Sequence, residues 1–513
     1  MTNTPRSRFL EILLLVVLGC FFVVSNPWLT VFDDEATLIT DAAAPLHQTL
    51  RAFWGGSGLH EHPPLFDLFL HFWLRITGGA FAWLRLPSIL FYLAGLWFLA
   101  RVAARLGGER SARSMLWLGA LWPYGFHYGR IAAWYSLCFL LVAALTLAYL
   151  RYAETLALRR WVVVMLLAAA LVCSNYFGWA ILACLAIDLV WRQRANLPRV
   201  AAPLLAGGFL LAVLYIPFWR VFWQELRSAP HLPHSLSGMA ALGGFSLYTA
   251  FVSESVAPWF WTLGIPAGLS VIACLLLTLK YAPAPARRFL FYGFILFASM
   301  MVLGIVNARR LLPEAAWVLL PIAVTLASLP RGLPRRALAA TLAGFIVIGW
   351  AGIYERRYYA APRFLEPWQG VADKAALRAN SGSLVIGNNP SFLFYLTYAL
   401  RVPERPEGWR FAGAVAWTIR DPRVFNPQDW AVAGHPLRPQ IYFVRGAPGP
   451  LESGPAWDAE QWLDRHCRLS SQESLLPDPA THLKARFIPQ FGEMPWRVRI
   501  REYACPAEAG AAR

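Results

Sequence analysis

The chain has few charged residues for its length. Of its 513 residues only 15% are Asp, Glu, Lys or Arg, while 58% are hydrophobic. A soluble globular protein carries about 25% charged residues, so this deficit excludes a soluble enzyme. The abundance of apolar side chains also excludes an intrinsically disordered chain. The sequence lacks any Cys-x-x-Cys motif, so its seven cysteines do not indicate a zinc site.

The chain does carry an excess of positive charge, with a formal net charge of +17. Such a charge could indicate a nucleic-acid partner. The basic residues are almost all Arg, however, and they cluster in short connections between long apolar stretches. This distribution is typical of the cytoplasmic loops of membrane proteins. The composition therefore predicts a polytopic α-helical membrane protein with membrane lipid, and no nucleic acid, as its partner.

About eleven apolar stretches can cross a bilayer as helices, which takes about 20 apolar residues each. They are residues 9–29, 86–100, 114–128, 131–150, 161–174, 177–191, 201–219, 258–279, 289–306, 314–329 and 337–354. Every second connection between them is basic, beginning with Arg6 and Arg8 ahead of the first stretch. Because basic loops stay in the cytoplasm, this alternation places the N-terminus inside and all residues after about 355 outside.

One further apolar stretch, residues 63–78, does not fit this alternation. It contains an Asp, a His and an Arg, and as a span it would invert the orientation of everything that follows. We expect it to form an amphipathic helix in the outer interface, which leaves a long first external loop over residues 30–85. Residues 220–257 form a second long external connection, predicted to be a mobile flap or a tolerated insertion.

The composition changes near residue 355, where Pro, Asp, Glu and other polar residues become more frequent. We therefore predict a membrane domain over residues 1–355 and a small extracytoplasmic α/β domain over residues 356–513. The elements predicted in the second domain are helices over 368–380 and 391–400 and strands over 383–386, 441–445 and 497–503. Cys467 and Cys505 both lie in this domain, where an oxidising compartment would let them pair as a disulfide.

Polar and charged residues gather at the predicted outer ends of the spans, where charge is costly and its placement informative. They are Asp33, Asp34, Glu35, His60, Glu61, His62, Arg85, His127, Tyr128, Arg130, Tyr135, Asn175, Tyr176, Arg309 and Arg310. We expect these side chains to face one external cavity. For the acids, three interpretations are open: a solvated loop, a general base for an incoming hydroxyl, or oxygen ligands of a divalent cation.

The cations in this set suit an anionic ligand. Guanidinium groups match phosphate oxygens with several donors, so Arg309 and Arg310 are candidates for binding a phosphate; the alternative is that they are interface anchors. His62 precedes two prolines that rigidify the chain, which favours an imidazole held towards the same anion.

The order of these residues resembles that of the membrane-embedded GT-C glycosyltransferases, in the branch of the aminoarabinose transferases and protein O-mannosyltransferases. The matching segments are Phe32-Asp33-Asp34-Glu35-Ala36, His62-Pro63-Pro64-Leu65-Phe66, Arg85-Leu86-Pro87-Ser88, Gly129-Arg130 with Tyr135-Ser136-Leu137, Asn307-Ala308-Arg309-Arg310-Leu311-Leu312-Pro313, and the region from Pro367-Trp368 to Leu400. They cover nearly the whole chain in the family's order. The acidic pair followed by His-Pro-Pro is the most specific match.

The resemblance implies a GT-C-like fold and an inverting glycosyltransferase in a bacterial cytoplasmic membrane. The enzyme would move a sugar from a polyprenyl-phosphate donor to a lipid, glycan or protein acceptor at the outer face. The implied roles are catalysis for Asp34 and Glu35, binding of the donor phosphate for His62, Arg309, Arg310 and Arg130, and lining of the substrate cavity for Tyr135, Tyr176, Arg85 and Glu61. No cofactor is required with certainty; a Mg or Mn ion, if one takes part, would bind at Asp34 and Glu35.

Two functions from other classes stay open at this stage. The chain could be a transporter or lipid flippase without transferase chemistry, although no inverted repeat is visible in the sequence. It could also be a non-catalytic subunit of a complex that assembles surface polysaccharides. The enzymatic interpretation expects the Asp34 carboxylate and the Arg309 guanidinium to share one polar pocket on the outer side. The sugar, the acceptor and the oligomeric state are not specified by the sequence.

Overall fold

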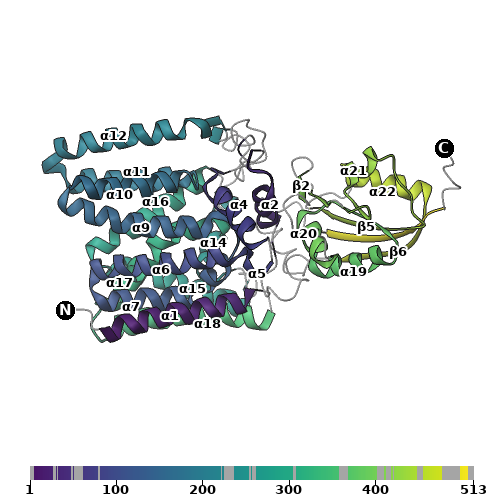
Figure 1. The fold of residues 1–513 in the computed structure, drawn as a ribbon. Helices are drawn as coiled ribbons and strands as arrows, with labels where there is room; N and C mark the ends of the chain where they lie inside the picture. Colours follow the sequence, from purple (N-terminus) through teal and green to yellow (C-terminus); the bar gives the residue numbers. More distant parts are fainter. Residues whose placement is uncertain are drawn as a thin grey trace. The chain divides into compact units, whose positions relative to one another are not determined.

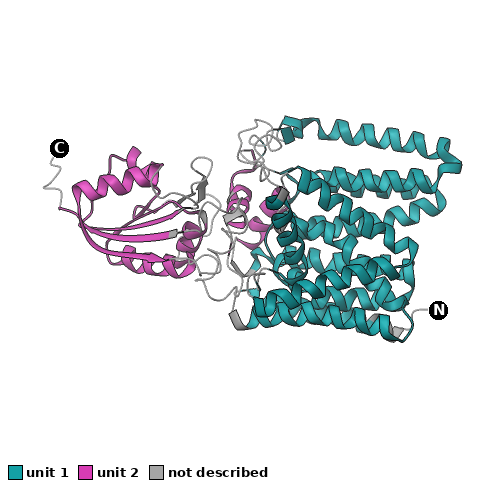
Figure 2. Ribbon diagram, turned by 180° about the vertical axis from the view of Figure 1, so that it is seen from behind, with its two compact units in different colours: residues 1–26, 50–66, 82–355 teal, residues 27–49, 67–81, 356–513 magenta. Residues whose placement is uncertain are grey.

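The computed structural model divides the chain into two compact units (Figure 2). It describes residues 5–26, 31, 33–47, 50, 62–78, 81–220, 222–223, 236–253, 256, 261–303, 308–356, 368–400, 409–411, 417–419, 421–447, 454–475 and 497–506. Unit 1 comprises residues 1–26, 50–66 and 82–355, and unit 2 comprises residues 27–49, 67–81 and 356–513. Unit 2 therefore combines the C-terminal residues with two short segments from the first external loop that we predicted.

Unit 1 is a bundle of α-helices (Figure 1). Its helices are α1 (Pro5–Val24), α6 (Leu86–Gly107), α7 (Glu109–Leu121), α8 (Pro123–Tyr128), α9 (Trp134–Thr155), α10 (Leu158–Val172), α11 (Phe177–Arg192), α12 (Leu197–Tyr215), α14 (Leu236–Val252), α15 (Trp261–Tyr281), α16 (Ala284–Val302), α17 (Leu312–Ser328) and α18 (Leu333–Arg356). Each of the eleven predicted stretches overlaps one or two of them. Within the described residues, six helices are long and apolar enough to cross a membrane, and three shorter apolar helices accompany them. The chain is thus a multi-pass membrane protein, and the number of eleven spans stays a prediction.

Helix α14 lies inside residues 220–257, which we predicted to be an external flap loop. For residues 236–252 that prediction is wrong, because the segment is apolar, free of charge and helical. At least one of its glycines, Gly243, serves close packing. A Cβ atom on Gly243 would come within 2.9 Å of the Met301 side chain, and small residues of this kind let membrane helices approach each other. Residues 224–235 of the predicted flap lie outside the described residues.

Helix α9 forms the centre of unit 1, since nearly all of its side chains are buried. It packs closely against α6 and α17. A Cβ atom on Gly95 of α6 would come within 2.5 Å of the Phe139 ring, so only glycine permits this approach. Trp317 of α17 donates its indole N–H to the hydroxyl of Thr146 over 2.9 Å. These contacts fix the helices whose ends carry the candidate site residues.

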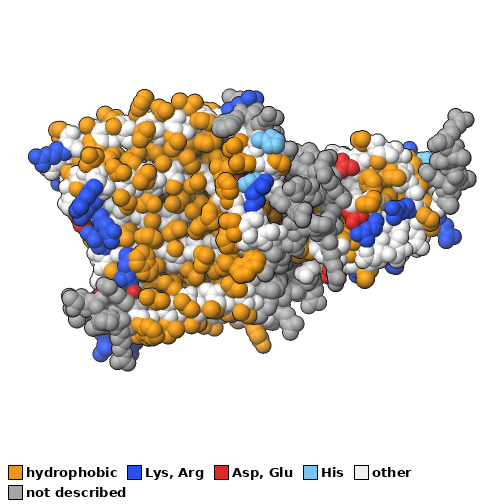
Figure 3. All heavy atoms as spheres, in the orientation of Figure 1, with side chains coloured by type: hydrophobic (Ala, Val, Ile, Leu, Met, Phe, Trp, Pro, Cys, Tyr) orange, Lys and Arg blue, Asp and Glu red, His pale blue; other side chains and the backbone are white. Residues whose placement is uncertain are grey.

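The outer surface of unit 1 suits a lipid environment. On the face that Figure 3 shows, hydrophobic side chains cover most of the helices, and Lys and Arg side chains gather at the end where the chain begins. Some of these cations pair with carboxylates, such as Arg101 with Glu11 and Arg105 with Glu154. A belt of apolar side chains ended by arginines is the distribution expected of a membrane domain.

Unit 2 is built on a five-stranded sheet in the order β4-β1-β5-β7-β6. The strands are β1 (Leu384–Gly387), β4 (Val424–Phe425), β5 (Gln440–Ala447), β6 (Arg468–Leu475) and β7 (Arg497–Ala504). The β1 strand is parallel to β4 and β5, and β7 is antiparallel to β5 and β6. Two further short strands, β2 (Trp409–Phe411) and β3 (Trp417–Ile419), pair with each other. The small α/β domain predicted at the C-terminus is confirmed.

Among the described residues after 356, four helices accompany this sheet (Figure 1). They are α19 (Trp368–Asn380), α20 (Pro390–Ala399), α21 (Pro427–Val432) and α22 (Pro455–His466). The two helices and three strands that we predicted here are confirmed to within a few residues at each end. Trp430 of α21 and Leu463 of α22 pack with the buried strand residues Ile386, Ile441 and Phe443 in one apolar core.

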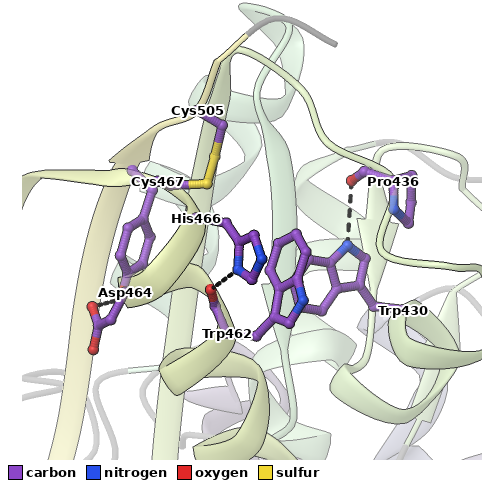
Figure 4. Close-up of a disulfide and its surroundings, with 8 residues drawn as sticks. Trp430, Pro436, Trp462, Asp464, His466, Cys467 and Cys505 are labelled. Carbon is purple, nitrogen blue, oxygen red and sulfur yellow. Dashed lines mark hydrogen bonds between the residues drawn. A yellow bond between two sulfur atoms is a disulfide. The ribbon is translucent and has the colours of Figure 1, made fainter. Parts of the chain in front are cut away.

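The disulfide predicted between Cys467 and Cys505 is present, with the two Cα atoms 4.4 Å apart (Figure 4). It joins the end of α22 to the end of β7. Beside it, the indole of Trp462 is stacked between the imidazoles of His435 and His466, with ring centroids 4.6 and 4.0 Å away. The disulfide therefore links α22 to the sheet next to a cluster of stacked aromatic side chains.

Candidate active site

Asp33, Asp34 and Glu35 occupy the first turn of helix α2 (Asp33–Ala43) in unit 2. Acidic side chains in the first turn are favoured because the N-terminus of a helix carries a partial positive charge. Glu35 is completely buried. Of Asp33 and Asp34 the structure describes the backbone, and their side chains lie outside the described residues. The sequence-predicted pair thus lies on an ordered helical turn.

Helix α2 is held by the C-terminal part of the chain. The backbone N–H of Val31, just ahead of α2, donates to the hydroxyl of Tyr395 on α20 over 2.6 Å. The body of α2 packs against α20 as well. The turn that carries Asp34 is therefore positioned by residues more than 350 positions later in the sequence.

The amphipathic helix predicted over 63–78 is present as α4 (Leu65–Thr77), and it packs against α2. The Nδ1 atom of His71 lies 2.7 Å from the carbonyl oxygen of Ala42, and Arg75 donates its Nε–H to the Nε2 atom of His71 over 2.9 Å. Since Nε2 accepts, Nδ1 carries the proton and donates to Ala42. Helix α4 thus turns polar side chains inward to fix the position of α2.

Two buried carboxyl groups face this α2–α4 contact. Burial raises the pKa of Asp41 from its ordinary value of 3.8 to about 8. Burial, followed by the charge of Asp41, raises the pKa of Asp67 well above its ordinary value. Two carboxylates in a shared apolar setting cannot both ionise cheaply. At neutral pH the contact therefore holds at least one protonated acid, and its stability depends on pH.

His62 lies in unit 1, directly before Pro63 and Pro64. The backbone N–H of Leu65 donates to the carbonyl oxygen of Cys173 over 3.0 Å, which ties this turn to the end of α10. The imidazole meets the indole of Trp134 edge-on, with ring centroids 4.9 Å apart, and the ring of Tyr176 lies 5.7 Å away. Its position is thereby set by aromatic rings from the starts of α9 and α11.

The imidazole of His62 is electrically neutral. Burial, and after it the positive charge of nearby Arg310, holds the pKa of His62 well below its ordinary value of 6.5. Its Nδ1 atom is shielded from solvent and has no hydrogen-bond partner among the described residues. A buried imidazole nitrogen without a partner is costly unless a ligand or water completes it. His62 is therefore suited to hydrogen-bond a bound group beside Arg310.

Arg309 and Arg310 belong to η4 (Ala308–Leu311), a short 3₁₀-helix that leads into α17 and packs against α14. Arg310 is half-buried, and its charge acts on His62. The side chain of Arg309 lies outside the described residues. The structure thus brings Arg310 and His62 together, as the sequence predicts, and leaves the role of Arg309 a proposal.

Arg130 and Arg85 are both buried and both reach the end of α1. Arg130 donates from Nε to the carbonyl oxygen of Phe126 over 2.7 Å and from a terminal nitrogen to the Ser25 hydroxyl over 2.8 Å. Arg85 donates to the carbonyl oxygen of Asn26 over 3.2 Å. These contacts place the two arginines in the frame that joins α1, α6 and α8. Their predicted part in substrate binding stays a prediction.

An aromatic wall surrounds the His62 position. The rings of Trp134 and Tyr135 lie 4.4 Å apart, and Tyr128 meets Tyr135 edge-on at 6.5 Å. Trp134, Tyr135 and Tyr128 are 2%, 4% and 1% exposed, so other protein groups cover their rings. Sequence reasoning included Tyr135 and Tyr176 but missed Trp134, because a tryptophan at the end of an apolar stretch usually indicates an interface anchor.

Asn175 is a second residue whose part the sequence did not specify. Its Oδ1 atom accepts from the backbone N–H of Phe177 over 2.8 Å at the start of α11. Its Nδ2 atom is buried without a hydrogen-bond partner among the described residues. A fixed amide whose N–H₂ group is unused offers two donors, and Asn175 directly precedes Tyr176, which contacts His62.

The described residues contain no complete set of metal ligands. Among them, no group of three or more His, Cys, Asp or Glu side chains lies close enough together to hold a metal ion. Glu61 and the side chain of Asp34 lie outside the described residues. The Mg or Mn ion considered from the sequence therefore stays a prediction.

The fold and part of the sequence match known proteins. Residues 61–220 match the family described as Dolichyl-phosphate-mannose-protein mannosyltransferase. Among solved structures, ArnT from Cupriavidus metallidurans in the apo state is similar with a TM-score of 0.54 and 13% identity, over 95% of this chain and 97% of that one. The same protein bound to undecaprenyl phosphate gives a TM-score of 0.53 and 12% identity, over 97% and 98%. No curated protein matches the chain in sequence.

These comparisons agree with the motifs. The segment that matches the mannosyltransferase family contains His62, Arg130 and Tyr176. The likeness to ArnT extends over nearly the whole of both chains, so it includes the helical bundle and the C-terminal domain. The resemblance to the GT-C glycosyltransferases is therefore confirmed.

Proposed function

Because this chain shares the GT-C fold, we propose that it is a glycosyltransferase that takes its sugar from a polyprenyl-phosphate donor. The reaction would run at the outer face of a bacterial cytoplasmic membrane, with the N-terminus in the cytoplasm. Support comes from the family match and from ArnT, whose solved structure contains undecaprenyl phosphate. A polyprenyl-phosphate sugar suits a multi-pass protein, because its tail needs lipid while its phosphate and sugar need polar groups.

The observation that carries this proposal is the arrangement of His62 and Arg310. It combines a cation with a neutral imidazole whose Nδ1 atom has no hydrogen-bond partner among the described residues, and the buried ring of Trp134 packs against that imidazole. These groups suit the phosphate of a lipid-linked sugar, because the cation matches its charge and the imidazole can hydrogen-bond one of its oxygens.

In the proposed reaction the acceptor hydroxyl or amine attacks the anomeric carbon of the donor. Asp34 takes the acceptor's proton as general base, and Glu35 orients Asp34. The bond from the anomeric carbon to the phosphate oxygen breaks, its electrons stay on that oxygen, and polyprenyl phosphate leaves. A single direct displacement inverts the configuration at the anomeric carbon. General-base catalysis of this kind contributes about 10²–10⁴-fold.

The leaving phosphate gains charge as the bond breaks. We propose that Arg309 and Arg310 stabilise this charge, that Arg130 maintains the frame that holds them or adds a further contact, and that His62 donates a hydrogen bond as a neutral group. Preorganised donors need no reorientation during the reaction, and the loss of one costs about 10²–10³-fold.

Mass spectrometry of surface glycans tests the function without knowledge of the sugar. Membranes and surface polymers of a deletion strain are compared with those of the strain complemented by the wild-type chain or by Asp34→Asn. We expect the deletion to remove one glycan modification and to accumulate a polyprenyl-phosphate sugar. Wild type should restore the modification, and Asp34→Asn, inserted at equal level, should not. Full restoration by Asp34→Asn would remove Asp34 from the mechanism, whereas unchanged glycans with altered lipid distribution in the deletion strain would contradict the transferase and favour a flippase.

A further inference from the structure

A groove with a volume of about 690 Å³ runs along unit 1, away from His62 and Arg310. It lies between α7, α17 and α18. Leu118 and Leu342 form part of its apolar lining, and the half-exposed Leu326 lies at the end of α17. Trp117 and Val347, which are 55% and 63% exposed, form its rims. An apolar groove on a membrane protein is a surface that lipid chains can fill.

Three arginines line one end of this groove. Arg110 and Arg113 come from the first turns of α7, and Arg335 comes from the first turn of α18. Towards the other end, the indole N–H of Trp350 on α18 donates to the carbonyl oxygen of Leu121 on α7 over 2.7 Å. The groove is therefore positive at one end and mostly apolar along the rest.

The charge of these arginines is not balanced by carboxylates of the described residues. Other arginines of unit 1 do form ion pairs with carboxylates: Arg101 pairs with Glu11, and Arg192 pairs with Asp188 over 2.7 Å. None of the described ion pairs includes Arg110, Arg113 or Arg335. Glu109, the acid next to them in sequence, is not among the residues that line the groove.

The helix directions differ at the arginine end of the groove. Helices α7 and α18 begin there and present the positive ends of their backbone dipoles, whereas α17, which contributes Leu326 and Ala327, ends there. Unsatisfied N–H groups at such helix starts also bind phosphate oxygens. Three guanidinium groups and two helix N-termini around one opening favour an anion with several oxygens.

The length of the groove corresponds to one leaflet of a membrane. Between Arg110 and Leu121 an α-helix rises about 16 Å. The hydrocarbon core of a bilayer is about 30 Å thick, so one leaflet measures about 15 Å. A headgroup held by the arginines would therefore place an acyl chain along the whole apolar part of the groove.

We propose that this groove is a binding site for an anionic phospholipid of the leaflet that faces the basic end, which the loop charges assign to the cytoplasm. The headgroup phosphate lies among Arg110, Arg113 and Arg335, and one acyl chain lies against Trp117 and Leu342. Basic pockets between membrane helices are known to select anionic lipids. This site is separate from the proposed transferase chemistry and does not depend on it.

Native mass spectrometry of the full-length protein in detergent tests the site, with phosphatidylglycerol as the probe and phosphatidylethanolamine as the zwitterionic comparison. The test variant is the triple substitution Arg110→Gln, Arg113→Gln and Arg335→Gln. The matched control removes the same charge at Arg159, Arg199 and Arg336, which do not line the groove. Ala343→Phe blocks the apolar part without a change of charge. Size-exclusion profiles and melting temperatures identify any variant that fails to fold.

We expect phosphatidylglycerol to bind wild type more tightly than phosphatidylethanolamine. The groove triple variant should lose about tenfold or more in affinity, since each basic residue near a membrane surface contributes measurably. The control triple variant should lose less than about threefold in affinity. Ala343→Phe should weaken the binding of phosphatidylglycerol. It should not change the binding of glycerol 1-phosphate, which carries the phosphate without acyl chains. Equal loss in both triple variants, equal binding of the two lipids, or full binding by Ala343→Phe would overturn the proposal.

Discussion

The imidazole of His62 packs edge-on against the indole of Trp134, with ring centroids 4.9 Å apart. This contact, with Tyr176 on another side, holds the imidazole beside Arg310. Because the pKa of His62 is held well below 6.5, the ring is neutral at physiological pH. In the proposed reaction His62 therefore acts on the donor phosphate as a neutral hydrogen-bond donor.

His62→Ala is expected to lower kcat/KM for a polyprenyl-phosphate donor by about 10²–10³-fold, as for the loss of one preorganised donor. His62→Asn should retain more activity than His62→Ala, since an amide can donate a hydrogen bond without charge. The measurement is donor turnover by purified variants of equal thermal stability. Equal activity of His62→Ala and wild type would remove His62 from the site.

Arg310→Gln is expected to change the dependence of the rate on pH. Burial is the main cause of the low pKa of His62 and the charge of Arg310 adds to it, so the loss of that charge lets the pKa rise part of the way towards its ordinary value of 6.5. A loss of rate should then set in as the pH falls towards that range, where wild type has none from this group. The double variant His62→Asn/Arg310→Gln serves as control and should lack the new dependence. Its persistence there would assign it to another residue.

Asp41→Asn is expected to remove part of the pH dependence of stability. The pKa of Asp41 is raised by burial to about 8, against about 3.9 in an unfolded chain. The folded protein therefore binds this proton more tightly than the unfolded chain does. The protonated carboxyl group adds stability that is complete below about pH 4 and is lost as the pH rises to about 8. Melting temperatures from pH 4 to 8 should fall less in Asp41→Asn than in wild type. The exposed Asp373→Asn serves as control, and a slope unchanged in Asp41→Asn would contradict the assignment.

Glu460→Gln is expected to destabilise the C-terminal domain strongly. Glu460 is completely buried on α22 and pairs with the equally buried Arg445, with Arg499 at 3.1 Å as a further partner. Loss of one partner leaves a buried charge uncompensated, which costs about 3–5 kcal/mol. The exposed pair of Lys374 and Glu473 gives the control, because Glu473→Gln should cost at most about 1 kcal/mol. Comparable unfolding free energies for the two variants would contradict this account.

The sequence was most informative where local patterns decide the structure. Apolar stretches located the helices of unit 1, and short apolar runs between turns located β1, β5 and α19. The β6 strand escaped prediction, because residues 468–475 are mostly polar and exposed and show no alternation. Helix α14 escaped it because residues 220–257 were treated as one long external connection, although residues 236–252 are apolar and free of charge.

Long-range relations could not be predicted. The contact between Val31 and Tyr395 assigns α2 to the same unit as the C-terminal residues, and no composition or spacing near residue 31 indicates it. Likewise, the oxidising compartment suggested that Cys467 and Cys505 could pair. The register that places the neighbouring residues Arg468 and Ala504 opposite each other involves β6, which was not predicted. For the site, the sequence indicated which residues are candidates, and the fold determines which of these residues lie close together.

The central claim is that Asp34 acts as the general base of a transfer from a polyprenyl-phosphate sugar. The most direct measurement follows the release of polyprenyl phosphate from a radiolabelled lipid-linked sugar by purified protein in nanodiscs, for wild type, Asp34→Asn and Arg309→Ala. The account predicts turnover by wild type, a loss of about 10²–10⁴-fold in Asp34→Asn at unchanged melting temperature, and weaker use of the donor by Arg309→Ala. Turnover by Asp34→Asn at the wild-type rate would contradict it.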